Sequence, residues 1–235
     1  MNENPDCPRC KASAVIKNGK VQEKQRYKCK ECGMQFTRLT PRGRPATEKA
    51  TAIMLYALGL SMNAIAQFLQ VSTPAILYWI RDFTQKNCEK PEPSSAIVVE
   101  LDEMWHFLNL KKNKLWIWKA YCRDTGKLID WECGKRDRKT LAKLMKRLKK
   151  WKVEIFCTDN WEIYNKEISA DKLKQSKAET VAIERNNGRQ RHWFARFRRK
   201  SIVVSKSLQM VELTIALFAR FHVNGNWQDI ITLFT

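Results

Sequence analysis

The stretch Ala96–Trp105, AIVVELDEMW, is an apolar run that ends in acidic residues. Its Ile97, Val98 and Val99 are β-branched and continuous, which is typical of a strand that is buried on both faces of a sheet. Asp102 stands near the far end of this strand, where a buried carboxylate costs several kcal/mol unless a cation meets it. The stretch therefore predicts a central strand that carries a functional carboxylate.

Two further acids stand in comparable positions. Residues 153–160, VEIFCTDN, form a short apolar strand that ends at Asp159, and residues 182–193, AIERNNGRQRHW, place Glu184 at the start of a strongly basic helix. Carboxylates are the hard ligands that Mg²⁺ selects, and two Mg²⁺ ions about 4 Å apart can drive phosphodiester cleavage. We predict that Asp102 bridges the two ions and that Asp159 and Glu184 each complete one site.

Four acids near the predicted ligands compete for the same role: Glu100, Glu103, Glu162 and Glu179. Strand alternation places Glu100 on the same face as Asp102 and Glu103 on the opposite face. Taken singly, any acid of this kind is more often a solvated charge. The catalytic interpretation therefore depends on three acids that lie on elements of one compatible fold.

The composition indicates an intracellular protein whose partner is an acidic polymer. The chain has 235 residues, a net charge of +20 and a pI of about 9.8, so double-stranded DNA is the natural partner. A hydrophobic content of 44% argues against wholesale disorder. No apolar run approaches the roughly 18 residues of a membrane span, and the N-terminus has no signal-peptide core. We therefore expect a cytoplasmic protein with no membrane partner.

The first 40 residues contain two CxxC pairs with the spacing C-x2-C-x18-C-x2-C, made by Cys7, Cys10, Cys29 and Cys32. Four thiolates at this spacing suit one closed, structural zinc ion. A catalytic zinc would need an open position, and free thiols clustered by chance are the remaining alternative. We predict a zinc-binding module over residues 1–40 whose stability comes largely from the metal. The other four cysteines are expected to be small buried hydrophobes.

Residues 40–46, TPRGRPA, read as a linker because they contain two prolines and a glycine. Arg42 and Arg44 could enter an A·T-rich minor groove in an extended conformation. The alternative is a basic linker that contacts phosphates only.

Residues 46–86 show helical periodicity and predict a helix-turn-helix DNA-binding domain. A first helix ends near Gly59, Ser61 can cap a short second helix, and Ser72 can cap a longer third helix. Short helix, tight turn and longer helix is the order of that motif. Thr73 and Arg81 would face the major groove. The alternative is a packing module of three helices that does not touch DNA.

Residues 87–95, NCEKPEPSS, predict an interdomain linker, and residues 96–235 predict the catalytic domain. Two more strands are expected over residues 114–122 and 128–133, joined by a turn at residues 124–127. Amphipathic helices are expected over residues 139–151 and 207–221. The order βββαβ followed by helices is that of a ribonuclease H-like fold with a mixed sheet, which makes the whole chain an α+β multidomain protein.

The segment after Glu184 is strongly basic, and no acid follows until Glu212. Surface helices usually mix both signs of charge, so this segment suits a phosphate backbone that enters the site. His192 could contact a phosphate, although a structural histidine is equally consistent. Over the whole chain the candidate DNA-binding residues are Arg42, Arg44, Thr73, Arg81, Arg185, Arg189, Arg191, His192, Arg196, Arg198, Arg199 and Lys200.

Together these motifs resemble the DDE transposases of the insertion-sequence-one family. The resemblance rests on CPRC…CKEC, the predicted helix-turn-helix, LDEMW, CTDNW and IERNNGRQRHWFARFRRKS, and it covers nearly the whole chain. By motif matching, Asp102, Asp159 and Glu184 take the places of the family's DDE triad. In that family the N-terminal part is often encoded separately and joined by frameshifting, whereas here both parts stand in one chain.

The resemblance implies DNA 3′-end cleavage at terminal inverted repeats, followed by attack of the freed 3′-OH on target DNA. It implies two catalytic Mg²⁺ ions, which Mn²⁺ could replace, a homo-oligomer that is at least a dimer on DNA, and a prokaryotic protein associated with the nucleoid. Two alternatives stay open. One is a non-catalytic DNA-binding regulator, and the other is a structure-selective nuclease on the same fold.

Overall fold

The computed structural model describes residues 4–37 and 43–225 and divides into two compact units, Met1–Pro45 and Ala46–Thr235. Arg42, one of the predicted DNA-binding residues, lies outside the described residues. Within the described ranges, no helix combines the length and apolar character that crossing a membrane requires. Each unit is considered by itself below.

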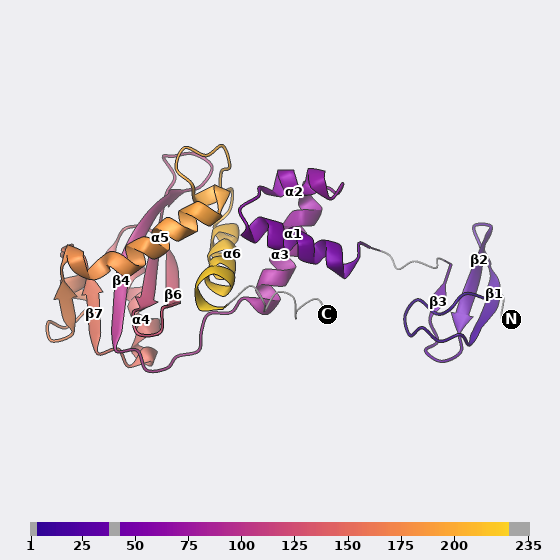
Figure 1. Cartoon of the computed structure of the whole chain (residues 1–235), viewed down its shortest axis with the longest axis horizontal. Coiled ribbons are helices and arrows are strands. Elements are labelled where there is room, and N and C mark those ends of the chain that lie inside the picture. The colour runs from indigo at the N-terminus through magenta and orange to yellow at the C-terminus, as the bar shows by residue number, and fades with distance from the viewer. Residues whose placement is uncertain (1–3, 38–42, 226–235) are drawn as a thin grey trace. The chain divides into compact units, whose positions relative to one another are not determined.

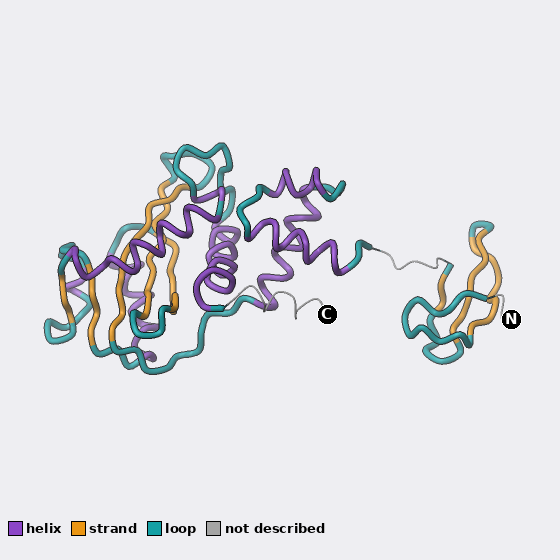
Figure 2. The backbone as a smooth tube through the Cα atoms, in the orientation of Figure 1, coloured by secondary structure: helices purple, strands orange, loops and turns teal. Residues whose placement is uncertain are grey.

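The N-terminal unit is a three-stranded antiparallel sheet of order β1-β2-β3 (Figure 2). Its strands are β1 (Val15–Val21), β2 (Lys24–Cys29) and β3 (Gln35–Phe36). Val15 and Phe36 are the buried side chains beside Cys7 and Cys29. So few apolar groups cannot stabilise a domain without a further constraint, which agrees with the expected dependence on metal.

The second unit begins with three helices, α1 (Ala46–Ala57), α2 (Met62–Phe68) and α3 (Thr73–Asn87). Both predicted caps are present, because the hydroxyl of Ser61 accepts from the N–H of Ala64 and that of Ser72 accepts from Ala75. Gly59 follows α1 with φ of +102°, a conformation that side chains with a Cβ rarely adopt. The local signals in the sequence therefore determined these helix ends.

These three helices share a hydrophobic core with the C-terminal helices. The Tyr56 hydroxyl lies 2.8 Å from the Thr214 hydroxyl, and Nε2 of His222 lies 2.9 Å from the carbonyl oxygen of Ala57. The rings of Phe83 and Phe221 stack with centroids 6.0 Å apart. Residues 87–95 therefore connect two parts of one compact unit, a packing that their linker-like composition does not reveal.

The second sheet contains five strands in the order β6-β5-β4-β7-β8 (Figure 1). Its strands are β4 (Val98–Phe107), β5 (Lys114–Cys122), β6 (Lys127–Gly134), β7 (Ile155–Thr158) and β8 (Leu173–Gln175). β5 pairs with β4 and β6 in antiparallel fashion, whereas β7 pairs in parallel with β4 and β8. The predicted mixed sheet is confirmed, and the predicted central strand lies in its middle.

Helices cover both faces of this sheet, with α5 crossing one of them (Figure 1). Val99 and Leu101 of β4 belong to the core that contains the buried face of α4 (Arg138–Leu148). Met104 belongs to the other core, under α6 (Leu208–Phe218). The remaining elements are η1 (Lys149–Trp151), η2 (Tyr164–Lys166), η3 (Lys177–Thr180), α5 (Val181–Trp193), η4 (Ala195–Phe197) and η5 (Ala219–Asn224).

Two elements differ from the prediction. β8 is not among the predicted strands, since a three-residue strand with Lys174 and Gln175 has no apolar pattern to reveal it. The helix that carries Glu184 begins earlier, at Val181, and ends at Trp193, because Phe194 takes an extended conformation and turns into the core. The basic residues after position 194 therefore lie on a short 3₁₀ turn and a loop rather than on a continuing helix.

Candidate active site

The parallel pairing of β4 and β7 brings two of the predicted acids to one edge of the site. The register runs from Val98 opposite Ile155 to Glu100 opposite Cys157. Continued by two residues, it sets Asp102 beside Asp159, which directly follows β7. The backbone N–H of Trp161 donates to Oδ1 of Asp159 over 3.1 Å and fixes that carboxylate at the strand end.

Helix α5 brings the third acid. The side-chain amide of Asn187 donates to Oδ2 of Asp102 over 2.7 Å, and Glu184 lies one turn earlier on the same side of the helix. The first turn of α5 is itself anchored, because the N–H of Ile183 donates to Oε2 of Glu100 over 2.8 Å. α5 thus holds Glu184 near the middle of β4, where Asp102 lies. The strand continues to Phe107, so the prediction that Asp102 stands near its far end is wrong.

The three carboxylates repel one another. Burial raises the pKa of Asp102 to about 6, and the charges of Asp159 and Glu184 add to the increase. None of the three forms an ion pair with any residue in the described ranges. A divalent cation would relieve this repulsion, so the donor set fits Mg²⁺. Within the described residues, the four N-terminal cysteines form the only group of three or more His, Cys, Asp or Glu side chains whose ligand atoms all lie within 4.8 Å of one another, so the three carboxylates are spaced more widely than that.

The competing acids have cations of their own. Arg123 donates to Glu100 over 2.8 Å and to Glu179 over 2.9 Å. On the opposite face, as alternation predicted, Glu103 pairs with Arg136 and accepts from the hydroxyl of Tyr164. Glu162 is exposed. Three of the four rivals are therefore structural ion-pair partners.

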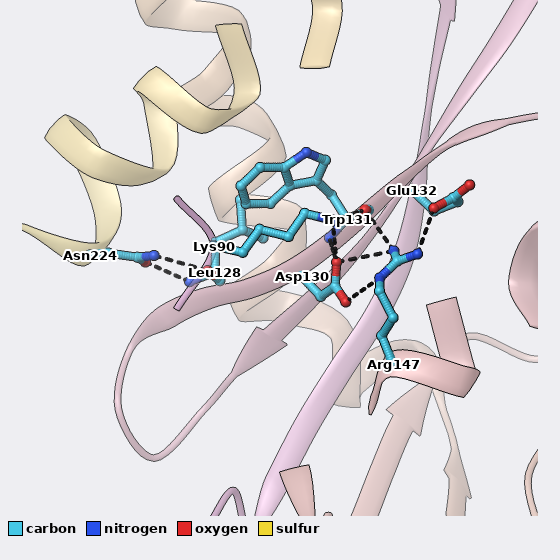
Figure 3. Close-up of polar contacts among 7 residues, drawn as sticks. All are labelled: Lys90, Leu128, Asp130, Trp131, Glu132, Arg147 and Asn224. Atoms are coloured by element: carbon cyan, nitrogen blue, oxygen red, sulfur yellow. Dashed lines mark hydrogen bonds and ion pairs between the residues drawn. The ribbon is translucent and has the colours of Figure 1, made fainter. Parts of the chain in front are cut away.

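A further acidic cluster on β6 shows the same arrangement (Figure 3). Asp130 is 3% exposed. Arg147 donates to Asp130 and Glu132, each over 2.8 Å, and Lys90 donates to Asp130 over 2.6 Å. The Lys90 ammonium also lies 4.7 Å from the ring of Trp131. With Lys143 also 3.8 Å from Glu132, three cations neutralise the two acids, and no carboxylate is left for a metal.

Lys119 is a candidate residue that the sequence analysis did not identify. It lies opposite Asp102 in the β4–β5 register and has no solvent exposure. Its Nζ donates to Oδ1 of Asn186 on α5 over 3.0 Å. Burial lowers the pKa of Lys119 to about 7, against the charge of Asp102, which raises it. A lysine inside the apolar pattern of a strand could have been noticed, but only the register shows which acid it faces.

The predicted zinc ligands converge. The sulfur atoms of Cys7 and Cys32 lie 3.6 Å apart, as do those of Cys10 and Cys29. Tetrahedral zinc with Zn–S bonds near 2.3 Å separates its sulfurs by about 3.8 Å. Gly33 follows the second pair with φ of +70° and donates its N–H to the carbonyl of Cys29. The four-cysteine cluster could therefore hold a zinc ion.

The basic residues after Glu184 fall into two groups. Arg185, His192, Arg199 and Lys200 are exposed. Others are engaged within the chain, with Arg189 donating to the carbonyl of His222 and Arg198 to that of His192.

Two further arginines of this segment lie partly buried. Burial and the nearby Arg199 lower the pKa of Arg191, while the charge of Asp102 opposes the change. The guanidinium of Arg196 lies 5.7 Å from the ring of Tyr56. Arg191 is thus a fixed positive charge near Asp102, whereas Arg196 packs on the helical part of the unit.

The predicted DNA contacts of the helical part are placed differently from one another. The hydroxyl of Thr73 donates to the side chain of Asn63 over 3.1 Å and so joins α3 to α2. Arg81 is half-buried on α3 and Arg44 is exposed just before α1. Tyr78, at 65% exposure, is the more prominent side chain of α3.

Comparisons with known proteins agree on one family. The family model described as IS1 transposase matches residues 95–224. The insertion element iso-IS1n protein InsB of Shigella dysenteriae is 34% identical over 128 residues, which cover 54% of this chain and 98% of that protein. The insertion element IS1 2 protein InsB of Escherichia coli (strain K12) is 33% identical over 126 residues, which cover 53% of this chain and 75% of that protein.

One solved structure aligns weakly. It is the cryo-EM structure of the simian T-cell lymphotropic virus intasome in complex with PP2A regulatory subunit B56 gamma. The alignment covers 75% of this chain and 67% of that chain, with a TM-score of 0.38 and 13% sequence identity. A similarity of this size does not bear on the fold or the function.

Proposed function

Because the chain belongs to the IS1 transposase family, we propose that it is a DDE transposase that cuts 3′ ends at terminal inverted repeats and joins them to target DNA. Residues 96–235 would then form a ribonuclease H-like catalytic domain, with the three helices before them acting as a helix-turn-helix. The two parts would stand in one fused chain. The observation that carries the proposal is the convergence of three unpaired carboxylates from β4, β7 and α5.

The side chains of this site would have distinct roles. Asp102, between the other two acids, would bridge two metal ions, and Asp159 and Glu184 would each complete one site. Bound Mg²⁺, or Mn²⁺ in its place, supplies an activated nucleophile and stabilises the leaving oxygen. Asn187 orients Asp102 through its 2.7 Å hydrogen bond. Arg191 would attract the phosphate backbone to the acids.

The remaining parts would bring DNA to this site. The helix-turn-helix would read the terminal repeat. A structural zinc would keep the basic N-terminal unit folded, so that this unit can bind the duplex. The exposed Arg185, Arg199 and Lys200 would bind phosphates. Joining two element ends requires at least a dimer on DNA. We place this activity in the prokaryotic cytoplasm, on the nucleoid.

The test is strand cleavage of a duplex that carries the element's own ends, in Mg²⁺ or Mn²⁺, with binding measured in Ca²⁺ on the same substrate. We expect cutting at the 3′ ends of the repeat by the wild type and none by Asp159→Ala, with DNA binding retained by both. Glu162→Ala is the matched control, since this acid follows the same strand and is exposed. Binding without cleavage by the wild type would reject the catalytic proposal in favour of a DNA-binding regulator.

Substrate choice separates the transposase from a nuclease. We expect cleavage to require the terminal repeat and the freed 3′-OH to join a second duplex. Equal cutting of unrelated branched DNA, without joining, would instead assign a structure-selective nuclease.

A further inference from the structure

The buried amino group of Lys119 has no role in the chemistry described above. It lies at 0% exposure between the sheet and the helices, with its Nζ 5.1 Å from the ring of Phe218. Among the described residues, the hydrogen-bond acceptor of Lys119 is a neutral group, the amide oxygen of Asn186 on α5. An ammonium in such a place destabilises a fold relative to an apolar side chain of similar volume. Stability alone therefore gives no reason for a lysine here.

The position of Lys119 relates it to the acids. It faces Asp102 across the β4–β5 ladder, and Asn186 is the neighbour of Asn187, which binds Asp102. Two side-chain bonds thus link α5 to adjacent strands at the same level, Asn187 to β4 and Asn186 to β5. Glu184 lies one turn before this pair, so any rotation or shift of α5 would move Glu184 relative to Asp102.

We propose that Lys119 is a positioning residue: through Asn186 it holds α5 against the sheet so that Glu184 faces Asp102 and Asp159 at the spacing a metal pair requires. The inference rests on the proposed function, because it assumes that these acids bind metal. Substituting a residue that orients a metal ligand without itself binding the metal typically lowers metal affinity roughly 10- to 100-fold. The hydrogen bond from Lys119 to Asn186 would orient Glu184 in this way, through its effect on the placement of α5.

The test is Mn²⁺ binding to the full-length chain, measured by electron paramagnetic resonance, with the Asp102→Ala protein defining the signal that does not come from this site. The decisive variant is Lys119→Met with Asn186→Leu. Replacing both partners by apolar groups of similar shape leaves neither of the two side chains with an unpaired buried polar atom, so this double variant should fold even where Lys119→Met alone does not. We expect it to bind Mn²⁺ at least about tenfold more weakly than wild type.

Stability provides the readout that separates positioning from a merely structural role. We expect the double variant to unfold at the same urea concentration as wild type or higher, although its Mn²⁺ affinity has fallen. Two controls on the same strand should keep wild-type affinity: Lys114→Met, the same substitution at an exposed site, and Ile117→Ala, which destabilises the core.

The outcomes are distinct. Wild-type Mn²⁺ affinity in the double variant would overturn the role of Lys119 and leave the proposed function intact. Equal affinity losses in the double variant and in Ile117→Ala would also overturn it, because general loosening would then explain both. If wild type and Asp102→Ala bind Mn²⁺ alike, the metal site itself is absent and the proposed function fails first.

Discussion

Two clusters of acids in the second unit differ in one respect, which is whether the chain supplies their cations. On β6, Asp130 and Glu132 are neutralised by Arg147 and Lys90 (Figure 3). Around Asp102, in the middle of β4, the three predicted ligands have hydrogen-bond donors but no ion pair among the described residues. The acids of the β6 cluster form ion pairs within the chain, whereas the three predicted metal ligands form none among the described residues, although Lys119 and Arg191 lie near enough to Asp102 to feel its charge. Each prediction below tests this difference.

The largest effect on stability is expected in the N-terminal unit, whose small hydrophobic core would depend on a bound metal. The four thiols of the N-terminal unit lie within 4.8 Å of one another, and structural zinc is worth about 10 kcal/mol or more to such modules. We expect one zinc per wild-type chain and none in Cys29→Ser with Cys32→Ser, whose N-terminal unit should unfold. Metal analysis and proteolysis would measure both, and full zinc occupancy in the double variant would contradict the assignment.

Removing one unpaired acid should abolish chemistry without harming the fold. Asp102→Ala removes a ligand shared by both proposed metal sites, which costs several kcal/mol of transition-state stabilisation and slows strand cleavage roughly a thousandfold. Losses within one unit are not additive, so Asp102→Ala with Glu184→Ala should be hardly slower. Normal cleavage by Asp102→Ala would refute the metal site.

Removing an acid that forms ion pairs should destabilise the fold and leave strand cleavage unchanged. Asp130→Asn removes the carboxylate that Lys90 and Arg147 share, leaving Arg147 with Glu132 only, and should lower the free energy of unfolding by about 3 kcal/mol. This is the lower end of the range for broken buried pairs, because both cations are partly exposed. Urea unfolding measures the loss, and the folded protein should cleave at the wild-type rate. Unchanged stability would show that the pairing in Figure 3 contributes nothing.

The same Asp→Asn substitution at Asp102 should raise, rather than lower, the free energy of unfolding. Its pKa is raised from 3.8 to about 6 in the folded chain, so ionisation destabilises the fold above pH 6 and this penalty disappears as the pH falls towards 3.8. Asp102→Asn should therefore raise the free energy of unfolding by about 2 kcal/mol at pH 7 and by nothing near pH 4. Urea titrations at both pH values, without added divalent cations, would detect it. A loss of stability at pH 7 would mean that Asp102 has a cationic partner after all.

The smallest effect is expected for the salt dependence of DNA binding, when exposed basic residues that form no ion pair with described residues are removed. Exposed Arg185, Arg199 and Lys200 form no ion pair with any described residue, and each phosphate contact contributes about 0.9 to the slope of log affinity against log salt. Alanine at all three should flatten the slope by up to about 3 while keeping the preference for the terminal repeat. Arg138→Ala, which removes an arginine paired with Glu167, is the control and should leave the slope unchanged.

Local patterns predicted much of this molecule. The continuous β-branched run gave strand β4, the serines at 61 and 72 gave two helix starts, and the CxxC spacing gave the cysteine cluster. Each depends on residues a few positions apart, which a reader of the sequence can see. The same patterns missed β8, whose Gln175 donates to the backbone carbonyls of Asp159 and Trp161, because three residues with one apolar member, Leu173, are too few to show a periodicity.

The sequence alone determined which residues could ligate metal and on which elements they stand. Only the tertiary structure decided which acids have cations, since Arg123 reaches Glu100 and Glu179 across 23 and 56 positions of sequence. It also decided that Lys119 faces Asp102 and binds Asn186, 67 positions away. Strand register and helix placement result from burying whole faces at once. Charge pairing, which depends on distances of a few ångströms, is therefore fixed only when the elements have packed.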